Sequence, residues 1–474
     1  MASPNIDFEK IPASIRKPGK YIEFNTKLAV RTLPANAQEV LILGQRLAAG
    51  EVPALTPTRV FSDAEAATCF GQGSMLHRMV RAAIRAYPYI SITCLALDDA
   101  AASVVATGTA TLAGTATGSG VATVRVGLDL VQVAVASGDT AADVAAALVA
   151  QASQQPDLPV VFAAAAGVLT LTAKHKGKLG NCIKLAASCT ASGLTATALA
   201  MSGGDVDPGV AVALALVASA GHDVIITPYA DETGLTALRE HLEFTGGPLE
   251  QRGAVGAYAL AGTLASATTL AGLVNHGRIS GALLRGARRL PWEIAAAFGA
   301  VIASEEDPAR PLNTLTLTGI DAPDVADRLT RTEQEVLLRN GVTPLEVGPD
   351  GTSVQIVRAI TTYTKDPQGI EDVSLLDLTT IRTLDYVRRA IRERVALRFP
   401  REKLSSRTPP AVRGEILDVL FKLEELEIVE EVEANKDGVI CERDSQDVNR
   451  LNAKIPTDVV NGLHVFAGRI DLLL

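Results

Sequence analysis

The sequence predicts an α/β multidomain protein: an interrupted α/β domain with an inserted β-rich domain, a C-terminal α+β domain, and extended N- and C-terminal strand arms. Strand and helix patterns alternate in 27–97 and resume in 206–340, which is typical of one layered domain with a mostly parallel sheet. Between these parts, residues 98–205 change abruptly to Ala, Thr, Gly and Val. Both ends of the chain carry short alternating strand patterns that have no local partner strand.

The residues before position 27 are predicted to form an extended arm. Pro18 and Gly19 mark a turn, after which the chain has the alternation of a short strand. Ile22 and Phe24 would lie on one face of this strand and Tyr21 on the other. Because nothing near this strand in the sequence can pair with it, its partner is expected to come from elsewhere.

Residues 27–97 and 206–340 are predicted to form the interrupted α/β domain. Its first part is expected to contain the strands Glu39–Leu43 and Ser91–Leu97 and the helix Ser74–Ala86. Its second part is expected to contain helices at Gly209–Ser219, Leu235–Phe244 and Leu270–Val274 and strands at Asp223–Pro228, Ala254–Ala259 and Ile279–Leu284.

Residues 98–205 are predicted to form the inserted domain. Runs of β-branched residues favour a folded insert over the alternative, a disordered segment rich in Thr and Gly. The expected elements are strands at Val121–Val126, Val131–Val135, Val160–Ala163 and Val168–Ala173 and a helix at Thr140–Ala152.

Residues 341–460 are more charged and are predicted to form the C-terminal α+β domain. The helix Thr379–Phe399 has the clearest apolar stripe in the sequence, and a second helix, Val412–Leu426, follows two prolines. A strand is expected at Arg450–Pro456.

Residues 461–474 are predicted to form a second strand arm. In Leu463–Leu474, the side chains of Phe466, Ile470 and Leu472 alternate onto one face. Chain ends fray unless they are tied down, so an apolar end indicates burial against something. The segment Leu463–Leu474 is therefore either the last strand of its own domain or a strand added to the open sheet edge of a neighbour.

Arg382, Arg389 and Arg392 lie on the face of the helix Thr379–Phe399 that is opposite its apolar stripe. Three interpretations are open: a solvated face, docking onto an acidic protein surface, and internal ion pairs. The acidic residues that would make internal pairs are Glu415, Asp418, Glu424, Glu425 and Glu427.

Composition and motifs exclude several function classes. A net charge of −9 argues against a general nucleic-acid binder, and no apolar run is long enough to predict direct membrane insertion. Five scattered cysteines and six separated histidines predict neither a disulfide framework nor a metal site. The carboxylates of 305–307 are expected in a solvated loop, and no nucleotide-binding motif occurs, so no cofactor and no catalytic residue is predicted.

Three blocks follow one another in a defined order along the chain: Pro18–Phe24, then Arg382–Arg389 running on to Phe399–Arg401, and then Ile455–Asp471. With the α/β region between the first two, they resemble the contractile phage tail sheath proteins. The nearest group is that of Mu-like bacteriophages, which is related to the tailocin and type VI secretion sheaths. The resemblance runs end to end, with 98–205 as its least diagnostic part.

This resemblance implies a structural subunit and not an enzyme. Such subunits stack as six-membered rings around a tail tube, and the sheath contracts to drive the tube through the envelope of a target cell. Its partners would be further copies of itself, the tail tube protein, and the baseplate and tail terminator proteins. The expected location is the virion tail, with the host cytoplasm during assembly.

The resemblance also implies roles for particular residues. The terminal arms would exchange strands with adjacent subunits through Tyr21, Ile22, Phe24, Leu463, Val465, Phe466, Ile470 and Leu472. Arg382, Arg389 and Arg392 would face the tube, and the insert would be an outward decoration. The candidate hinges of the arms are Pro18, Gly19, Asn461 and Gly462.

Two alternatives to a phage tail sheath remain open. One is the sheath of a phage-derived bacteriocin or of a secretion apparatus, which would share the architecture. The other is an α/β enzyme whose catalytic residues meet only in space and form no sequence motif.

Overall fold

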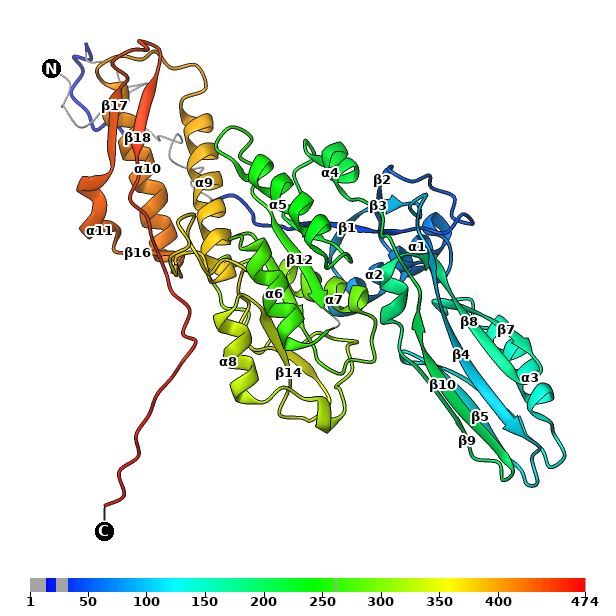
Figure 1. Cartoon of the computed structure of the whole chain (residues 1–474). Coiled ribbons are helices and arrows are strands. Elements are labelled where there is room, and N and C mark those ends of the chain that lie inside the picture. The colour runs from blue at the N-terminus through cyan, green and yellow to red at the C-terminus, as the bar shows by residue number, and fades with distance from the viewer. Residues whose placement is uncertain (1–13, 23–32, 261, 474) are drawn as a thin grey trace.

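The central sheet is built from two distant parts of the chain. In the computed structural model, which describes residues 14–22, 33–260 and 262–473, eight strands pair in the order β15-β14-β13-β12-β11-β1-β3-β2 (Figure 1). All neighbours pair in parallel except the edge strands β2 and β15, which are antiparallel. The strands are β1 (Glu39–Gln45), β2 (Pro57–Val60), β3 (Ser91–Leu97), β11 (Val224–Ile226), β12 (Val255–Leu260), β13 (Ile279–Leu283), β14 (Thr343–Val347) and β15 (Val354–Ile356).

Helices cover both faces of this sheet. Consecutive residues of a strand point to opposite faces, and Gly256 of β12 lies against Leu238 and Leu242, whereas Ala257 lies against Gly299. The first two leucines belong to α5 and Gly299 to α7, so these helices lie on opposite sides. The helices of this part are α1 (Asp63–Phe70), α2 (Met75–Ala86), α4 (Ala211–Val217), α5 (Glu232–Gly246), α6 (Leu264–Val274), α7 (Pro291–Ser304) and α8 (Arg331–Arg339).

Helix α7 is buried all round. Every residue from Pro291 to Ala303 is buried, and α7 packs against α2 and the central strands. A helix with no polar face shows no amphipathic stripe. Apolar periodicity therefore does not predict α7, although this helix lies at the centre of the core.

Residues 105–202 form separate sheets that project from one end of the body (Figure 1). One sheet has the order β10-β4-β8-β7 and the other β6-β5-β9, with α3 packed beside them. Val104 pairs with Asp205, so the two ends of this insert lie side by side. Its elements are β4 (Val105–Gly114), β5 (Gly120–Val126), β6 (Asp129–Val135), α3 (Ala141–Ser153), β7 (Val160–Ala165), β8 (Val168–Lys176), β9 (Leu185–Cys189) and β10 (Leu194–Ser202).

A buried arginine ties the insert to the body. Arg78 of α2 donates from Nε to Oε1 of Glu293 at 2.6 Å, and both side chains are buried. Its Nη1 donates to Oδ2 of Asp129 at 2.9 Å and to the carbonyl oxygen of Asp157 at 2.7 Å, both in the insert. One charged side chain therefore bridges α2, α7 and the insert.

The C-terminal part has a small core of its own. Helix α9 (Leu378–Arg398) contributes Leu378 and Ile381 to the main core, and Tyr386 and Val387 to this second core. α9 thus joins the two parts of the molecule. The other elements are α10 (Thr408–Glu425), β16 (Val429–Glu430), α11 (Val432–Asn435), β17 (Ile440–Arg443), β18 (Leu451–Lys454) and β19 (Asp458–Val459).

The sequence expectations are met for the coarse architecture, a mixed α/β protein with several sheets. The central sheet continues to Ile356, however, past the expected end of the α/β domain at residue 340. Strands β4, β9 and β10 were missed, because their Ala- and Thr-rich sequences have little apolar alternation. The division into domains at the residues given above remains a prediction.

We predict that Arg78→Met lowers the free energy of unfolding by about 3–5 kcal/mol, because it removes the short bond to the buried Glu293 carboxylate and leaves that carboxylate the longer contact with Arg289, at 3.5 Å. Chemical denaturation of the full chain, followed by circular dichroism, measures this change. Arg331→Met, at an exposed position of α8, is the matched control and should change stability by less than about 0.5 kcal/mol. Equal losses in the two variants would contradict the bridging role of Arg78.

Candidate functional site: the chain ends and the helix α9 cleft

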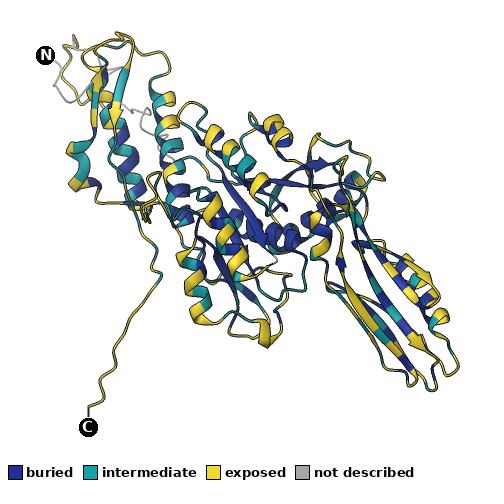
Figure 2. Cartoon of the chain, in the orientation of Figure 1, coloured by how far each residue is buried: buried dark blue, intermediate teal, exposed yellow. Residues whose placement is uncertain are grey.

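The last residues of the chain form an arm that contacts little of the body. Residues 461–473 contain no strand, and the arm ends away from the other elements (Figures 1 and 2). The side chains of Phe466 and Ile470 are 87% and 98% exposed, and Leu463, Val465 and Leu472 are exposed as well. Of the two interpretations of this arm, a last strand of its own domain is wrong for residues 463–473, and strand addition to a neighbour stays a prediction.

The root of this arm is fixed two residues beyond the predicted hinge at Asn461 and Gly462. Asn313 donates from Nδ2 to Nδ1 of His464 at 2.9 Å, and Nε2 of His464 lies 3.4 Å from Oδ1 of Asp377. Nε2 of His464 thus faces this carboxylate. A Cβ on Gly462 would lie 2.5 Å from Pro311, so Gly462 is closely packed here.

Asp377 holds this root electrostatically. Burial opposes its charge, but bonds from His464 and from Arg358 outweigh that effect and lower the pKa of Asp377 to about 2. Arg358 donates to both carboxylate oxygens, at 2.8 and 2.7 Å. Asp377 therefore stays ionised and keeps the root in place at neutral pH.

The described part of the N-terminal arm is also exposed. Tyr21 and Ile22 are outside any strand, and Ile22 is 85% exposed. Tyr21 donates from its hydroxyl to the carbonyl oxygen of Lys17 at 3.1 Å and lies against Gly19. Phe24, the third predicted arm residue, lies outside the described residues. The predicted hinge at Pro18 and Gly19 stays a prediction.

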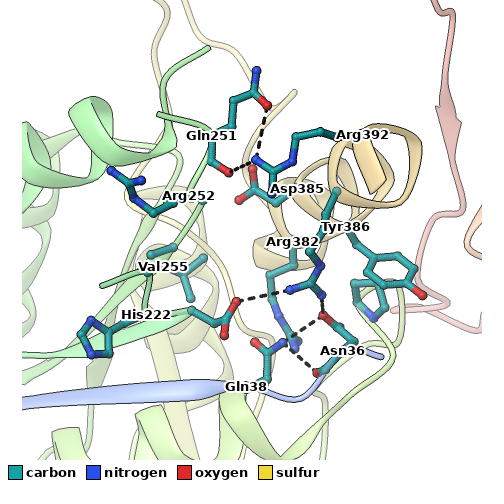
Figure 3. Close-up of a pocket in the computed structure, with 16 residues that line it drawn as sticks. Asn36, Gln38, His222, Gln251, Arg252, Val255, Arg382, Asp385, Tyr386 and Arg392 are labelled. Atoms are coloured by element: carbon teal, nitrogen blue, oxygen red, sulfur yellow. Dashed lines mark hydrogen bonds and ion pairs between the residues drawn. The ribbon is translucent and has the colours of Figure 1, made fainter. Parts of the chain in front are cut away.

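The three arginines predicted to face a tube line a cleft inside this chain (Figure 3). The cleft has a volume of about 170 Å³ and lies between α9 and the amino ends of β1, β11 and β12. Arg382 is only 7% exposed, so it cannot face a tube in this conformation, and that prediction is wrong for this residue. The helix turns it inward because Leu378 and Ile381, which precede it, are anchored in the main core.

Arg389 and Arg392 contact the chain ahead of β1 and the loop before β12. Arg389 is half-buried and hydrogen bonded to the side-chain oxygen of Asn36, and it lies 3.8 Å from Oδ1 of Asp223. Arg392 is exposed, and its Nη1 donates to the carbonyl oxygen and to Oε1 of Gln251, both at 3.3 Å. A role for these two residues in tube binding stays a prediction.

Two further arginines hold the middle of α9 through Asp385. Arg278 donates from Nη1 and Nη2 to the two oxygens of Asp385, at 2.5 and 3.0 Å. Arg388 donates to Oδ1 of Asp385 at 2.7 Å and to the carbonyl oxygen of Gly246 at 2.8 Å. This cluster joins α9 to the end of α5 and to β13, and no sequence motif signals it.

The expected pairs with the acidic residues of α10 are made by two other arginines of α9, which lie on the side facing α10. Arg394 lies 3.9 Å from Glu415 and 3.3 Å from Asp418, and Arg398 lies 3.4 Å from Glu415. Of the other acidic residues expected to pair, Glu424 instead accepts from the backbone nitrogen of Val432.

An apolar groove of about 630 Å³ opens on the other side of α9. It is walled by Val387, Ile391 and Val395 of α9, by Ile416 of α10, and by Leu451 of β18. The expected stripe of α9 is therefore only partly covered by its own chain.

The histidines belong to no metal-binding cluster in the described part of the chain. Among the described residues, no group of three or more His, Cys, Asp or Glu side chains is arranged to hold a metal ion. Nor does any described helix combine the length and the apolar character that crossing a membrane requires.

Two family models match this chain. The model for the phage tail sheath protein central domain matches residues 204–362, and that for the phage tail sheath C-terminal domain matches residues 371–472. The Mu-like prophage FluMu tail sheath protein of Haemophilus influenzae is 35% identical over 488 residues, which cover 99% of this chain and 100% of that protein. The chain belongs to the phage tail sheath family.

Solved structures share the fold of this sheath family member. The sheath tail protein Lin1278 from Listeria innocua matches with a TM-score of 0.50 at 13% identity, covering 91% of this chain and 94% of that chain. A chain of the anti-feeding prophage (AFP) baseplate matches with a TM-score of 0.52 at 12% identity, covering 97% and 100%. A chain of the PVC sheath complex in the contracted state, from an extracellular contractile injection system, matches with a TM-score of 0.51 at 11% identity, covering 97% and 98%.

Because it belongs to this family, the chain is a structural protein of the tail sheath type. Helix α9 and the C-terminal arm, as far as residue 472, lie within the matched C-terminal domain. The N-terminal arm lies outside both matched domains. The residues that bind and orient α9 therefore stabilise the fold of the subunit. The exposed arm residues make few contacts within the single chain.

We predict that this sheath protein loses stability as the pH falls from about 6.5 to 4. Burial, with the charge of His222, lowers the pKa of His241 to about 4, and burial, with Arg278 and Arg239, lowers that of His276 to about 4. The unfolded chain, with histidine pKa values of about 6.5, then binds more protons in this window. The stabilisation is complete above pH 6.5 and is lost on acidification.

Chemical denaturation at several pH values measures this slope. The double variant His241→Gln, His276→Gln should flatten the slope between pH 6.5 and 4 and leave the behaviour between pH 7 and 8 unchanged. A slope as steep as that of the unsubstituted chain would show that other groups cause the acid sensitivity.

Proposed function

We propose that the protein is the subunit of a contractile tail sheath that stacks as six-membered rings around the tail tube. The observation that carries this proposal is the exposed apolar arm after His464, because apolar residues are rarely left in water along a whole chain end. In an assembly of identical copies, a neighbour can cover each arm. Family membership supports the same role.

The arms are proposed to add strands to the sheets of adjacent subunits. At about 3.3 Å per residue, the ten residues after His464 can extend about 33 Å as a strand. The hairpin β17–β18 is a suitable acceptor, since a two-stranded sheet is marginal alone and gains stability from further strands. Leu451 and Ala453 of β18 already line the apolar groove, so an added strand could place side chains there.

Contraction is proposed to draw on the assembly itself. A metastable extended sheath can relax to a state with larger contacts between subunits, while backbone pairing keeps the arms attached and their roots turn. The anchoring of His464 by Asn313 and Asp377 supports a pivot just after this residue. The projection of the insert away from the C-terminal part supports its proposed place on the outside of the sheath (Figure 1).

The proposed partners are further copies of the chain, the tail tube protein, and the baseplate and tail terminator proteins. The proposed location is the virion tail, reached by assembly in the host cytoplasm. The prophage origin of the 35% identical relative favours a phage tail over a bacteriocin or secretion sheath.

We predict that removal of residues 465–474 abolishes sleeve formation but leaves the folded subunit intact. The deletion keeps the His464 anchor and removes an arm that contacts little of its own chain. Negative-stain microscopy should show hollow, striated sleeves for the full chain and none for the deletion, at similar melting temperatures. Normal sleeves from the deletion would disprove strand donation by the C-terminus.

A finer test uses the alternation of the arm. Phe466→Asp with Ile470→Asp should block sleeves, because both side chains lie on the face that a neighbour would bury. Arg469→Ser, on the opposite face of a strand, is the matched control and should assemble. If both variants assemble equally well, the arm does not bind as a strand.

We predict that Arg392→Glu weakens co-assembly with tail tubes if α9 faces the tube. Arg392 is the exposed member of the three arginines, so a charge reversal there should leave the fold intact. A pull-down with purified tubes measures the effect, with Arg331→Glu as the control. Unchanged tube binding would remove α9 from the tube interface and would leave the sheath assignment standing.

A further inference from the structure

The cleft beside α9 is unusually basic for an acidic protein. Among the described residues that line it are four arginines and two aspartates, in a chain of net charge −9. Amide side chains from Asn36, Gln38 and Gln251 complete the wall (Figure 3). All of these amides and arginines can donate hydrogen bonds toward a bound group.

Arg382 is a buried cation with a spare donor in this cleft. Its Nη2 donates to the carbonyl oxygen of Glu305 at 2.5 Å, but its Nη1 has no hydrogen-bond partner in the described part of the chain. Burial lowers the pKa of Arg382 to about 10, against the opposing charges of Glu305, Asp223 and Asp307. The guanidinium is thus still charged at pH 7, and a buried donor of a charged group that is left unpaired costs stability.

Other arginines of the cleft have donors to spare. Arg389 leaves Nε without a partner in the described residues, although its other nitrogens contact Asn36 and Asp223. Arg392 uses a single nitrogen, Nη1, for its two long bonds to Gln251.

The two aspartates of the cleft are already engaged. Asp385 accepts from Arg278 and Arg388, which lie outside the lining of the cleft. Asp223 accepts from the backbone nitrogen of Glu39 at 2.9 Å. Arg252 is neutralised by its pair with Glu250. Asp223 also pairs with Arg389, at 3.8 Å. What remains facing the cleft is the positive charge of Arg382 and Arg392.

We propose that this cleft binds a tetrahedral oxyanion such as inorganic phosphate, with Arg382 and Arg392 as its principal ligands. The planar guanidinium fork matches the geometry of such an anion and forms strong charge-assisted hydrogen bonds with it. A volume of about 170 Å³ is several times the ~30 Å³ occupied by one liquid water, so the anion fits together with some waters.

The bound anion joins α9 to the amino ends of the central strands. It sits where Asn36 and Gln38 lead into β1, and where α9 passes from the main core to the second core. It therefore fixes the orientation of the C-terminal part, which carries one arm, relative to the body.

The test measures phosphate binding to the purified full chain by isothermal titration calorimetry, and melting temperature in sodium phosphate against sodium chloride at equal ionic strength. Phosphate should bind saturably and raise the melting temperature more than chloride does. Arg392→Gln should weaken binding about tenfold or more, as expected for the loss of a hydrogen bond to a charged group. Arg382→Gln should do the same, and Arg331→Gln on α8 should bind as the unsubstituted chain does.

Arg392→Gln keeps the proposal testable if Arg382→Gln does not fold, because Arg392 is exposed. Equal melting temperatures in phosphate and chloride, with no heat of binding, would overturn the proposal. So would full affinity in Arg392→Gln, or a loss in Arg331→Gln as large as that in the cleft variants, which would indicate binding by surface charge alone. None of these outcomes involves sleeves or tubes, so they do not bear on the sheath assignment.

Discussion

The arginine face of α9 is the contact on which the arrangement of the molecule depends. This helix starts in the main core and ends in the second core, and its length leaves a charged face pressed against the amino ends of the central strands. The paired guanidinium and carboxylate groups of Arg278 and Asp385 make that contact directional, which apolar packing alone does not. The position of the second core, the groove on α9 and the root of the arm all follow from the path of this helix.

The sequence predicts those elements that carry a continuous or a periodic apolar pattern. The strands β1 and β3 and the helices α2, α9 and α10 match their expected positions within a few residues, because each has a clear apolar pattern. The fully buried α7 and the Ala- and Thr-rich strands of the insert lack such a pattern, and only tertiary packing defines them. The same limit applies to the site. The sequence shows the arginine pattern of α9 but does not predict where each arginine points. Arg382 is turned inward by core contacts that local periodicity does not reveal.

At the C-terminal end the opposite holds: the sequence predicts a strand that the single chain does not form. The alternation of Phe466, Ile470 and Leu472 describes a strand, yet the isolated subunit offers no backbone for it to pair with. Under the proposed strand exchange, the secondary structure of the arm depends on neighbouring copies of the chain. An extended, exposed arm in the subunit and a strand pattern in the sequence are thus consistent with each other.

The two ends of the insert are joined by a hydrogen bond from the backbone nitrogen of Val104 to the carbonyl oxygen of Asp205, at 2.9 Å. A segment whose ends meet in this way can be exchanged for another with little strain on the host fold, so residues 105–202 form a natural grafting position for a foreign domain. The graft has one electrostatic requirement. Arg78 takes two of its partners from the segment that would be removed, so a replacement domain must either supply an acceptor there or be combined with neutralisation of Arg78 and Glu293 together.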